Sequence, residues 1–169
     1  LNAGIYKPVT IENFDIHVFK IHNDVNYMGV INSFDAFIKK MLDRKSRSIL
    51  IMSSVAGWIG LPKASAYSPT KASLRSFAQS IRYDLLKYNV DIKICSPGFV
   101  NTNATKYNDF YMPGLIEPKK AAKLILKGLS GKRFEISFPF AFSLTMKILY
   151  LIPDKLSFLI IKHITAKND

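Results

Sequence analysis

The chain has 169 residues, 49% of them hydrophobic and 21% charged, and it carries a formal net charge of +12. This composition is typical of one globular domain with its own core, and a single cysteine excludes an internal disulfide or a cysteine-rich zinc site. The 24 basic residues are scattered and lack an aromatic-interleaved motif, so we favour solvated helix faces over a nucleic-acid groove.

The hydrophobic pattern predicts helices that alternate with strands. From Tyr27 to Leu42 the apolar residues fall on one helical face, whereas "SILIM" after it is a short apolar run without alternation. Such a run is typical of a strand buried on both faces of a parallel sheet. The alternation predicts a layered α/β fold. In chain order we expect a helix over 27–42, a strand over 48–52, a helix over 66–88, a strand over 90–95, a helix over 117–129 and a strand over 133–138.

Small, polar or turn-forming residues follow three predicted strands. "NAG" (Asn2, Ala3 and Gly4) opens the chain and would follow a strand that is mostly missing, Ser53 and Ser54 follow "SILIM", and Ser96-Pro97-Gly98 follows "VDIKIC". In open α/β sheets, ligands bind beyond the carboxyl ends of the strands. These three segments are therefore candidates for one binding site.

Tyr67 and Lys71 lie four residues apart at the start of the second helix, so they share one face. Pro69 between them fits only the first turn, where its missing N–H is harmless. A nearby ammonium favours the phenolate and lowers the pKa of a phenol, while Ser54 is suited to hydrogen-bond a substrate oxygen. The pattern predicts a proton-transfer site in which Tyr67 moves the proton and Lys71 tunes it.

The same spacing occurs once more on the same helix, at Tyr83 and Lys87. This second pair lies about 24 Å from the first at helical rise, and no strand end supplies it with a serine. We interpret it as an amphipathic surface pair, so the context of Tyr67 and Lys71 distinguishes them, not the spacing.

Four motifs in order resemble the short-chain dehydrogenase/reductase family: "NAG", "DVNYMGV", "SILIMSSVAG" with "YSPTK", and "SPGFVNT". The resemblance extends from Asn2 to the strand near Phe138. It implies an NAD- or NADP-dependent oxidoreductase with a Rossmann-like, doubly wound parallel sheet in three α/β/α layers. The choice between NAD and NADP stays open.

The resemblance also implies the roles of individual residues. Tyr67 would be the acid-base residue, Lys71 would also bond the nicotinamide ribose, Ser54 would orient the substrate, and Asn26 would hold a water in the proton relay. Asn26 also admits a purely structural interpretation, as a hydrogen-bonding residue within its helix. The cofactor-binding residues implied are Asn2, Ala3, Gly4, Tyr67, Lys71, Pro97, Gly98 and Thr102.

One family feature is absent from this sequence, the glycine-rich turn that binds the cofactor phosphates. We therefore expect residues 1–169 to be an N-terminally truncated part of a longer protein, with little cofactor binding or turnover alone. Residues 1–138 would be the C-terminal part of the catalytic domain, and residues 139–169 an apolar, basic helical extension of it.

The extension admits three interpretations: it covers the substrate pocket, packs in a dimer, or rests on an anionic membrane. We favour pocket or subunit packing, and we expect a homo-oligomer when the protein is full length. We expect no signal peptide, and residues 136–146 are too short to span a bilayer, so we expect a cytoplasmic protein with a membrane-associated alternative.

Large apolar side chains in the 101–114 loop suggest an apolar or lipid-like substrate: Tyr107, Phe110, Tyr111 and Met112. The predicted activity interconverts a carbonyl and a secondary alcohol. The alternative is a non-catalytic nucleotide-binding or membrane-associated module that retains the fold. His17, His22 and His163 have no metal-binding spacing, and we expect no metal.

Overall fold

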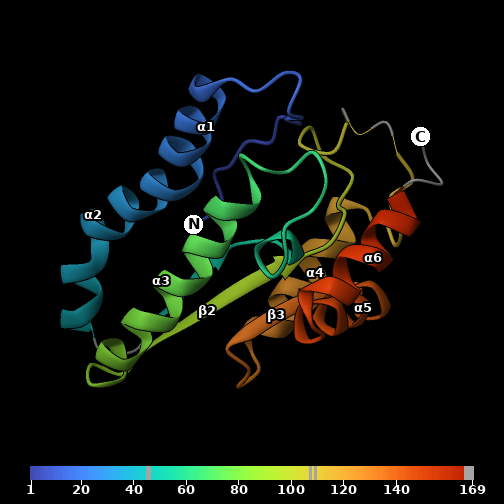
Figure 1. Cartoon of the computed structure of the whole chain (residues 1–169). Coiled ribbons are helices and arrows are strands. Elements are labelled where there is room, and N and C mark those ends of the chain that lie inside the picture. The colour runs from blue at the N-terminus through green and yellow to red at the C-terminus, as the bar shows by residue number, and fades with distance from the viewer. Residues whose placement is uncertain (45–46, 107, 109, 166–169) are drawn as a thin grey trace.

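The computed structural model of the chain describes residues 1–44, 47–106, 108 and 110–165 (Figure 1). All six elements predicted from the sequence are present, and the C-terminal segment forms two further helices. The elements are α1 (Ile16–His22), the π-helix η1 (Asn23–Met28), α2 (Gly29–Arg44), β1 (Arg47–Met52), the 3₁₀ turn η2 (Val55–Gly57), α3 (Ser68–Leu86), β2 (Val90–Pro97), α4 (Pro118–Leu129), β3 (Glu135–Phe138), α5 (Phe140–Leu151) and α6 (Asp154–Thr165).

The first helical region begins eleven residues earlier than predicted, at Ile16 instead of Tyr27. Asp15 caps this start, because its carboxylate accepts a hydrogen bond from the His17 N–H at 2.9 Å. Two apolar residues of α1, Ile16 and Ile21, are exposed, so this stretch lacks a clean apolar stripe in the sequence. The π-helical turn between α1 and α2 was also not predicted.

The three strands form one parallel sheet in the order β1-β2-β3. Ile49 lies beside Ile92, and Cys95 beside Ile136. Leu1 pairs with the outer edge of β1: its amino group donates to Leu50 O at 2.7 Å, and its carbonyl accepts from Met52 N at 2.9 Å. This pairing positions the residues after Leu1 near the carboxyl end of β1.

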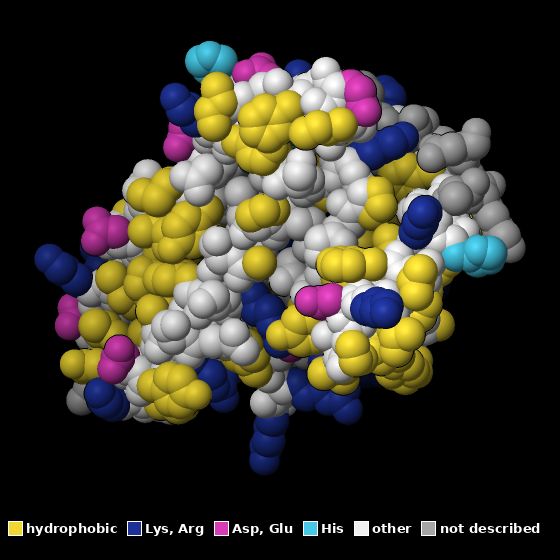
Figure 2. Space-filling view, viewed as in Figure 1, with side chains coloured by type: hydrophobic (Ala, Val, Ile, Leu, Met, Phe, Trp, Pro, Cys, Tyr) yellow, Lys and Arg dark blue, Asp and Glu magenta, His cyan; other side chains and the backbone are white. Residues whose placement is uncertain are grey.

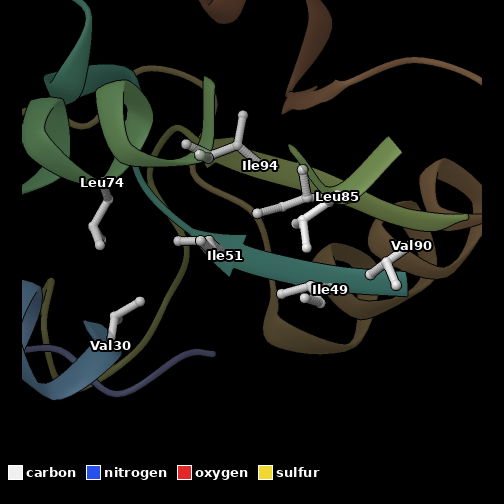
Figure 3. Packing of buried hydrophobic residues seen from close by; sticks show 9 residues of the cluster. Val30, Ile49, Ile51, Leu74, Leu85, Val90 and Ile94 are labelled. Atoms are coloured by element: carbon white, nitrogen blue, oxygen red, sulfur yellow. The ribbon is translucent and has the colours of Figure 1, made fainter. Parts of the chain in front are cut away.

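Helices cover both faces of the sheet, which confirms the predicted three layers. On one face α2 and α3 pack against the strands through side chains that are almost fully buried (Figure 3): Val30, Ile49, Ile51, Leu74, Ala78, Leu85, Val90, Ile92 and Ile94. On the other face α4 packs against Cys95, Ile136 and Phe138. Because successive strand residues point to opposite faces, one uninterrupted apolar run supplies both cores.

The C-terminal helices lie beside the segment that follows β1. Val55 and Trp58 of that segment are buried against Met146 and Leu149 of α5, and Ile161 of α6 packs on the edge of this cluster. Among the described residues, no helix has both the length and the apolar character needed to cross a bilayer.

Candidate active site

The carboxyl ends of β1 and β2 are joined around Ser53 and Ser54. Ser53 N donates to Cys95 O at 2.7 Å, and its buried hydroxyl donates to Lys71 O at 2.9 Å, so Ser53 links both strands to α3. Ser54 takes the next position with an extended backbone and caps η2 by accepting from Ala56 N at 3.2 Å. Its hydroxyl lies 3.5 Å from Pro97 O, at the end of β2.

Tyr67 immediately precedes α3, and Pro69 lies in the first turn of this helix, as the sequence predicted. The Thr70 hydroxyl donates to Tyr67 O at 2.7 Å and the Tyr67 N–H donates to Ala64 O at 3.0 Å, which together hold the backbone of Tyr67 in place. The Ser54 hydroxyl is near enough to that of Tyr67 to lower the pKa of the phenol by hydrogen bonding. The structure thus brings together a phenol and a serine hydroxyl that are thirteen residues apart in the sequence.

Lys71 extends from the first turn of α3 toward the same place, and only 4% of its surface is exposed. Its ammonium donates to Met52 O at 3.0 Å and lies 5.6 Å from the centroid of the Tyr67 ring. A Cβ atom on Gly4 would lie 3.4 Å from this ammonium and 3.3 Å from Asn26 Oδ1. The bare backbone of Gly4 therefore approaches both side chains closely.

Asn26 is fully buried in the π-helical turn. Its side chain forms two hydrogen bonds with the backbone of Ile5, accepting from the N–H at 2.7 Å and donating to the carbonyl at 3.0 Å. It also donates to the Thr70 hydroxyl at 3.2 Å. Asn26 thus joins three segments: the N-terminal segment, η1 and the start of α3. π-helical turns are frequently found at functional sites.

Burial dominates the electrostatics of the site. It raises the pKa of Tyr67 to about 12, against a smaller lowering effect of the Ser54 hydrogen bond, and Tyr6, whose ring meets the Tyr67 ring edge-on at 5.3 Å, raises it further. Burial also lowers the pKa of Lys71 to about 8. The sequence-based expectation of a lowered phenol pKa is wrong for this chain, because removing the phenolate from water outweighs the nearby ammonium.

The remaining predicted cofactor residues lie at varying distances from this centre. The carbonyl of Pro97 contacts the Ser54 hydroxyl, so Pro97 lies at this centre. Gly98 donates to Phe138 O at 2.7 Å and lies against Phe142 of α5. Thr102 is exposed and bonds to Thr105 within its own turn. Asn2 and Ala3 are also exposed.

In the 101–114 loop, the Phe110 ring lies 5.9 Å from that of Phe99, which itself lies 5.3 Å from Phe142. These aromatic contacts connect the loop to α5. Tyr111 is 75% exposed, and Tyr107 lies outside the described residues.

The donor set fits the ribose end of a nicotinamide nucleotide. Sugar hydroxyls can form hydrogen bonds with a buried ammonium and with a phenol. The exposed backbone of Gly4 leaves room for a sugar beside these two groups, because glycine has no Cβ. Lys71 and Tyr67 would hold such a group.

Sequence reasoning missed two side chains at the site, Thr70 and Glu135. Thr70 gave no signal, because a threonine in a first helical turn is common. Glu135 did give a signal in the sequence, because it is a charged residue within the predicted strand "RFEISF". A charge in a half-buried strand costs free energy unless an opposite charge or hydrogen-bond donors pair with it.

Comparisons with known proteins agree with this fold. Residues 1–110 match the family model described as short chain dehydrogenase. An uncharacterized oxidoreductase of Myxococcus xanthus is 35% identical over 133 residues, which are 79% of this chain and 53% of the relative. A 3-dehydrosphinganine reductase of Danio rerio is 31% identical over 146 residues, 80% of this chain and 44% of the relative. The chain thus spans about half the length of the curated relatives it matches.

Solved structures share the fold. A short-chain dehydrogenase of Burkholderia cenocepacia in complex with NADP has a TM-score of 0.78 at 22% identity, over 86% of this chain and 62% of that one. A short-chain dehydrogenase of Streptomyces avermitilis also has a TM-score of 0.78, at 19% identity, over 99% of this chain and 69% of that one.

Proposed function

Because the chain belongs to the short-chain dehydrogenase family, we propose that it carries the proton-transfer half of an NAD- or NADP-dependent enzyme that interconverts a carbonyl and a secondary alcohol. The observation that supports this most is the grouping of the Ser54 and Tyr67 hydroxyls with the buried Lys71 ammonium, which lies 5.6 Å from the centroid of the Tyr67 ring. The Danio rerio relative is itself named a reductase.

When bound, a nicotinamide supplies or accepts the hydride, so the residues of this chain must handle the proton and the substrate oxygen. With a pKa of about 12, the Tyr67 phenol is protonated at neutral pH and serves as a general acid toward a carbonyl oxygen. Ser54 donates a hydrogen bond to the same oxygen as its charge develops. This protonation state favours the direction of carbonyl reduction.

Lys71 and Asn26, which both lie close to Gly4, support the proton transfer in different ways. At neutral pH most of the Lys71 amine is charged, because its pKa is about 8, and its charge offsets the phenolate that remains after the proton has left. Asn26 holds the start of α3 through Thr70 and positions the segment next to Gly4 through Ile5. A water held by Asn26 would connect Lys71 to solvent.

We propose an apolar substrate. The aromatic side chains of Phe99, Phe110 and Phe142 gather where the 101–114 loop meets α5, next to Gly98. Such a surface suits an aliphatic ketone better than a sugar or an organic acid.

The decisive experiment is Tyr67→Phe in the protein expressed from the complete reading frame. Turnover is followed by reduced-nicotinamide absorbance with a series of aliphatic ketones of increasing chain length and both cofactors. We expect kcat to fall about 10²- to 10⁴-fold, the usual contribution of a general acid. Tyr83→Phe is the matched control, because Tyr83 has the same spacing to a lysine but is 74% exposed. Equal turnover of the wild type and Tyr67→Phe would refute the proposal.

A second candidate function, peripheral membrane attachment, is favoured by the surface of α5 and α6. Figure 2 shows hydrophobic and lysine side chains intermixed over this region. Ten large apolar residues of the two helices are at least 41% exposed: Phe140, Leu144, Ile148, Tyr150, Leu151, Leu156, Phe158, Leu159, Ile160 and Ile164. Together with Lys155 and Lys162, they form a surface suited to an anionic bilayer.

Vesicle flotation tests this attachment with anionic and neutral lipids. We expect the double variant Leu159→Ser, Lys162→Glu to lose binding to anionic vesicles, whereas Leu86→Ser, an exposed leucine of α3, keeps it. Deleting residues 139–169 is a poorer test, because Trp58 would lose its cover from α5. The wild type remaining at the bottom of the gradient with anionic vesicles would refute attachment.

A further inference from the structure

A single carboxylate behind the candidate active site collects donors from three segments of the chain. Glu135, at the start of β3, has a side chain that is only 10% exposed. Its Oε1 accepts hydrogen bonds from the Ser96 hydroxyl at 2.7 Å, from the Trp58 indole N–H at 2.8 Å and from the Arg75 guanidinium. Lys147 of α5 lies 3.7 Å from Oε2 and covers the Trp58 ring at 5.4 Å.

Each donor sits close in sequence to a residue of the proposed mechanism. Trp58 lies four residues after Ser54, at the end of η2. Arg75 lies one helical turn after Lys71 on α3. Ser96 precedes Pro97, whose carbonyl contacts the Ser54 hydroxyl. Glu135 therefore ties the segment that carries the serine to the helix that carries the lysine.

The cluster has no other evident task among the described residues. A buried charge costs free energy unless it is paired, and replacing such a group by apolar side chains often leaves stability unchanged or higher. Here the negative charge is matched by Arg75 and Lys147, and its hydrogen bonds fix directions as well as distances. An apolar contact at this place would hold the three segments together without fixing their orientation.

We propose that Glu135 is a positioning residue that orients the Ser54 segment relative to α3, and thereby sets the position of the Ser54 hydroxyl relative to that of Tyr67. The proposal rests on the proposed function. It assigns to a glutamate outside the four motifs an effect on turnover that is exerted through Trp58 and Arg75. Misplacing a reacting group by about 1 Å lowers a rate about 10²-fold, so the effect is measurable.

The test compares Glu135→Gln, which keeps the size and removes the charge, with Asp84→Asn, which removes an exposed carboxylate from its ion pair with Lys87 on α3. In residues 1–169 Trp58 is the only tryptophan, so its emission reports on the cluster. In the protein from the complete reading frame, kcat and KM are measured with the ketone that gives the highest turnover. Melting curves for both variants ensure that the assay temperature lies below unfolding.

We expect Glu135→Gln to change the emission of Trp58 and to lower kcat about 10- to 100-fold, with the KM for cofactor within about twofold, while Asp84→Asn matches the wild type. A folded Glu135→Gln with wild-type kcat overturns the proposal. If this variant is unfolded at the assay temperature, Trp58→Phe decides, because it removes one donor and keeps an aromatic ring: a lower kcat supports the proposal, and an unchanged kcat refutes it. Tyr67→Phe is assayed in parallel, and its full activity would instead refute the proposed function.

Discussion

The burial of Lys71 predicts that the site weakens the fold at neutral pH. The pKa of its amine falls from 10.5 to about 8 on folding because the charged form is removed from water. This difference corresponds to about 3.4 kcal/mol. The hydrogen bond from the amine to Met52 O stabilises the folded state by about 1–1.5 kcal/mol and so offsets part of this cost. Lys71→Met, which keeps the aliphatic stem, should therefore raise the free energy of unfolding by about 2 kcal/mol at pH 7.

The sign of the pH dependence follows from proton counting. Between pH 8 and 10.5 the unfolded chain holds the proton on Lys71 more often than the folded chain, so the wild type gains stability as the pH rises. The advantage of Lys71→Met should shrink by about 3 kcal/mol over this range and end slightly negative. The phenol of Tyr67 is present in both proteins, so its titration cancels to first order.

Urea titrations of residues 1–169 at pH 7, 8.5 and 10, followed by Trp58 emission, measure this difference. Lys87→Met is the matched control: Lys87 is the C-cap residue of the same helix and has the same spacing to a tyrosine, but its side chain is 72% exposed. We expect it to change the unfolding free energy by less than about 0.5 kcal/mol at every pH. If Lys71→Met were less stable than the wild type at pH 7, or its advantage stayed constant from pH 8 to 10, burial would not be the cause of the lowered pKa.

Two further substitutions test the scaffold around the site. Asn26→Ala leaves the N–H and the carbonyl of Ile5 without their partner, so the unfolding free energy measured in urea should fall by about 2–3 kcal/mol; a loss below about 0.5 kcal/mol would show that water replaces these bonds without cost. Gly98→Ala places a Cβ 2.6 Å from the Phe142 ring and should lower the melting temperature, equivalent to about 1–3 kcal/mol. In a double-mutant cycle with Phe142→Leu the two losses should be less than additive, and full additivity would contradict the contact.

The family match covers all four sequence motifs. The match of residues 1–110 agrees with the resemblance seen in "NAG", "DVNYMGV", "YSPTK" and "SPGFVNT". Of the residues with proposed roles, Tyr67 is tested by the turnover of Tyr67→Phe, whereas Lys71→Met and Asn26→Ala test the charge and the scaffold of the site.

Local sequence determined the type of six elements and their order along the chain. The apolar run "SILIM" and the helical face from Tyr27 to Leu42 depend on the period of apolar side chains, and Pro69 limits Tyr67 to the start of α3 whatever surrounds it. These properties depend on neighbours within a few residues, so they can be predicted from the sequence alone.

Only the tertiary structure decided the partners and the charge state of the site. Asn26 meets Thr70, which is 44 residues away, and Glu135 meets Trp58, which is 77 residues away, and nothing in the local pattern specifies either contact. The pKa of Tyr67 depends on how much water reaches its hydroxyl, which is set by all the segments that surround it. Spacing brought the phenol and the amine to the same helical face, but desolvation set the pKa of each, so that at neutral pH the phenol keeps its proton and most of the amine is charged.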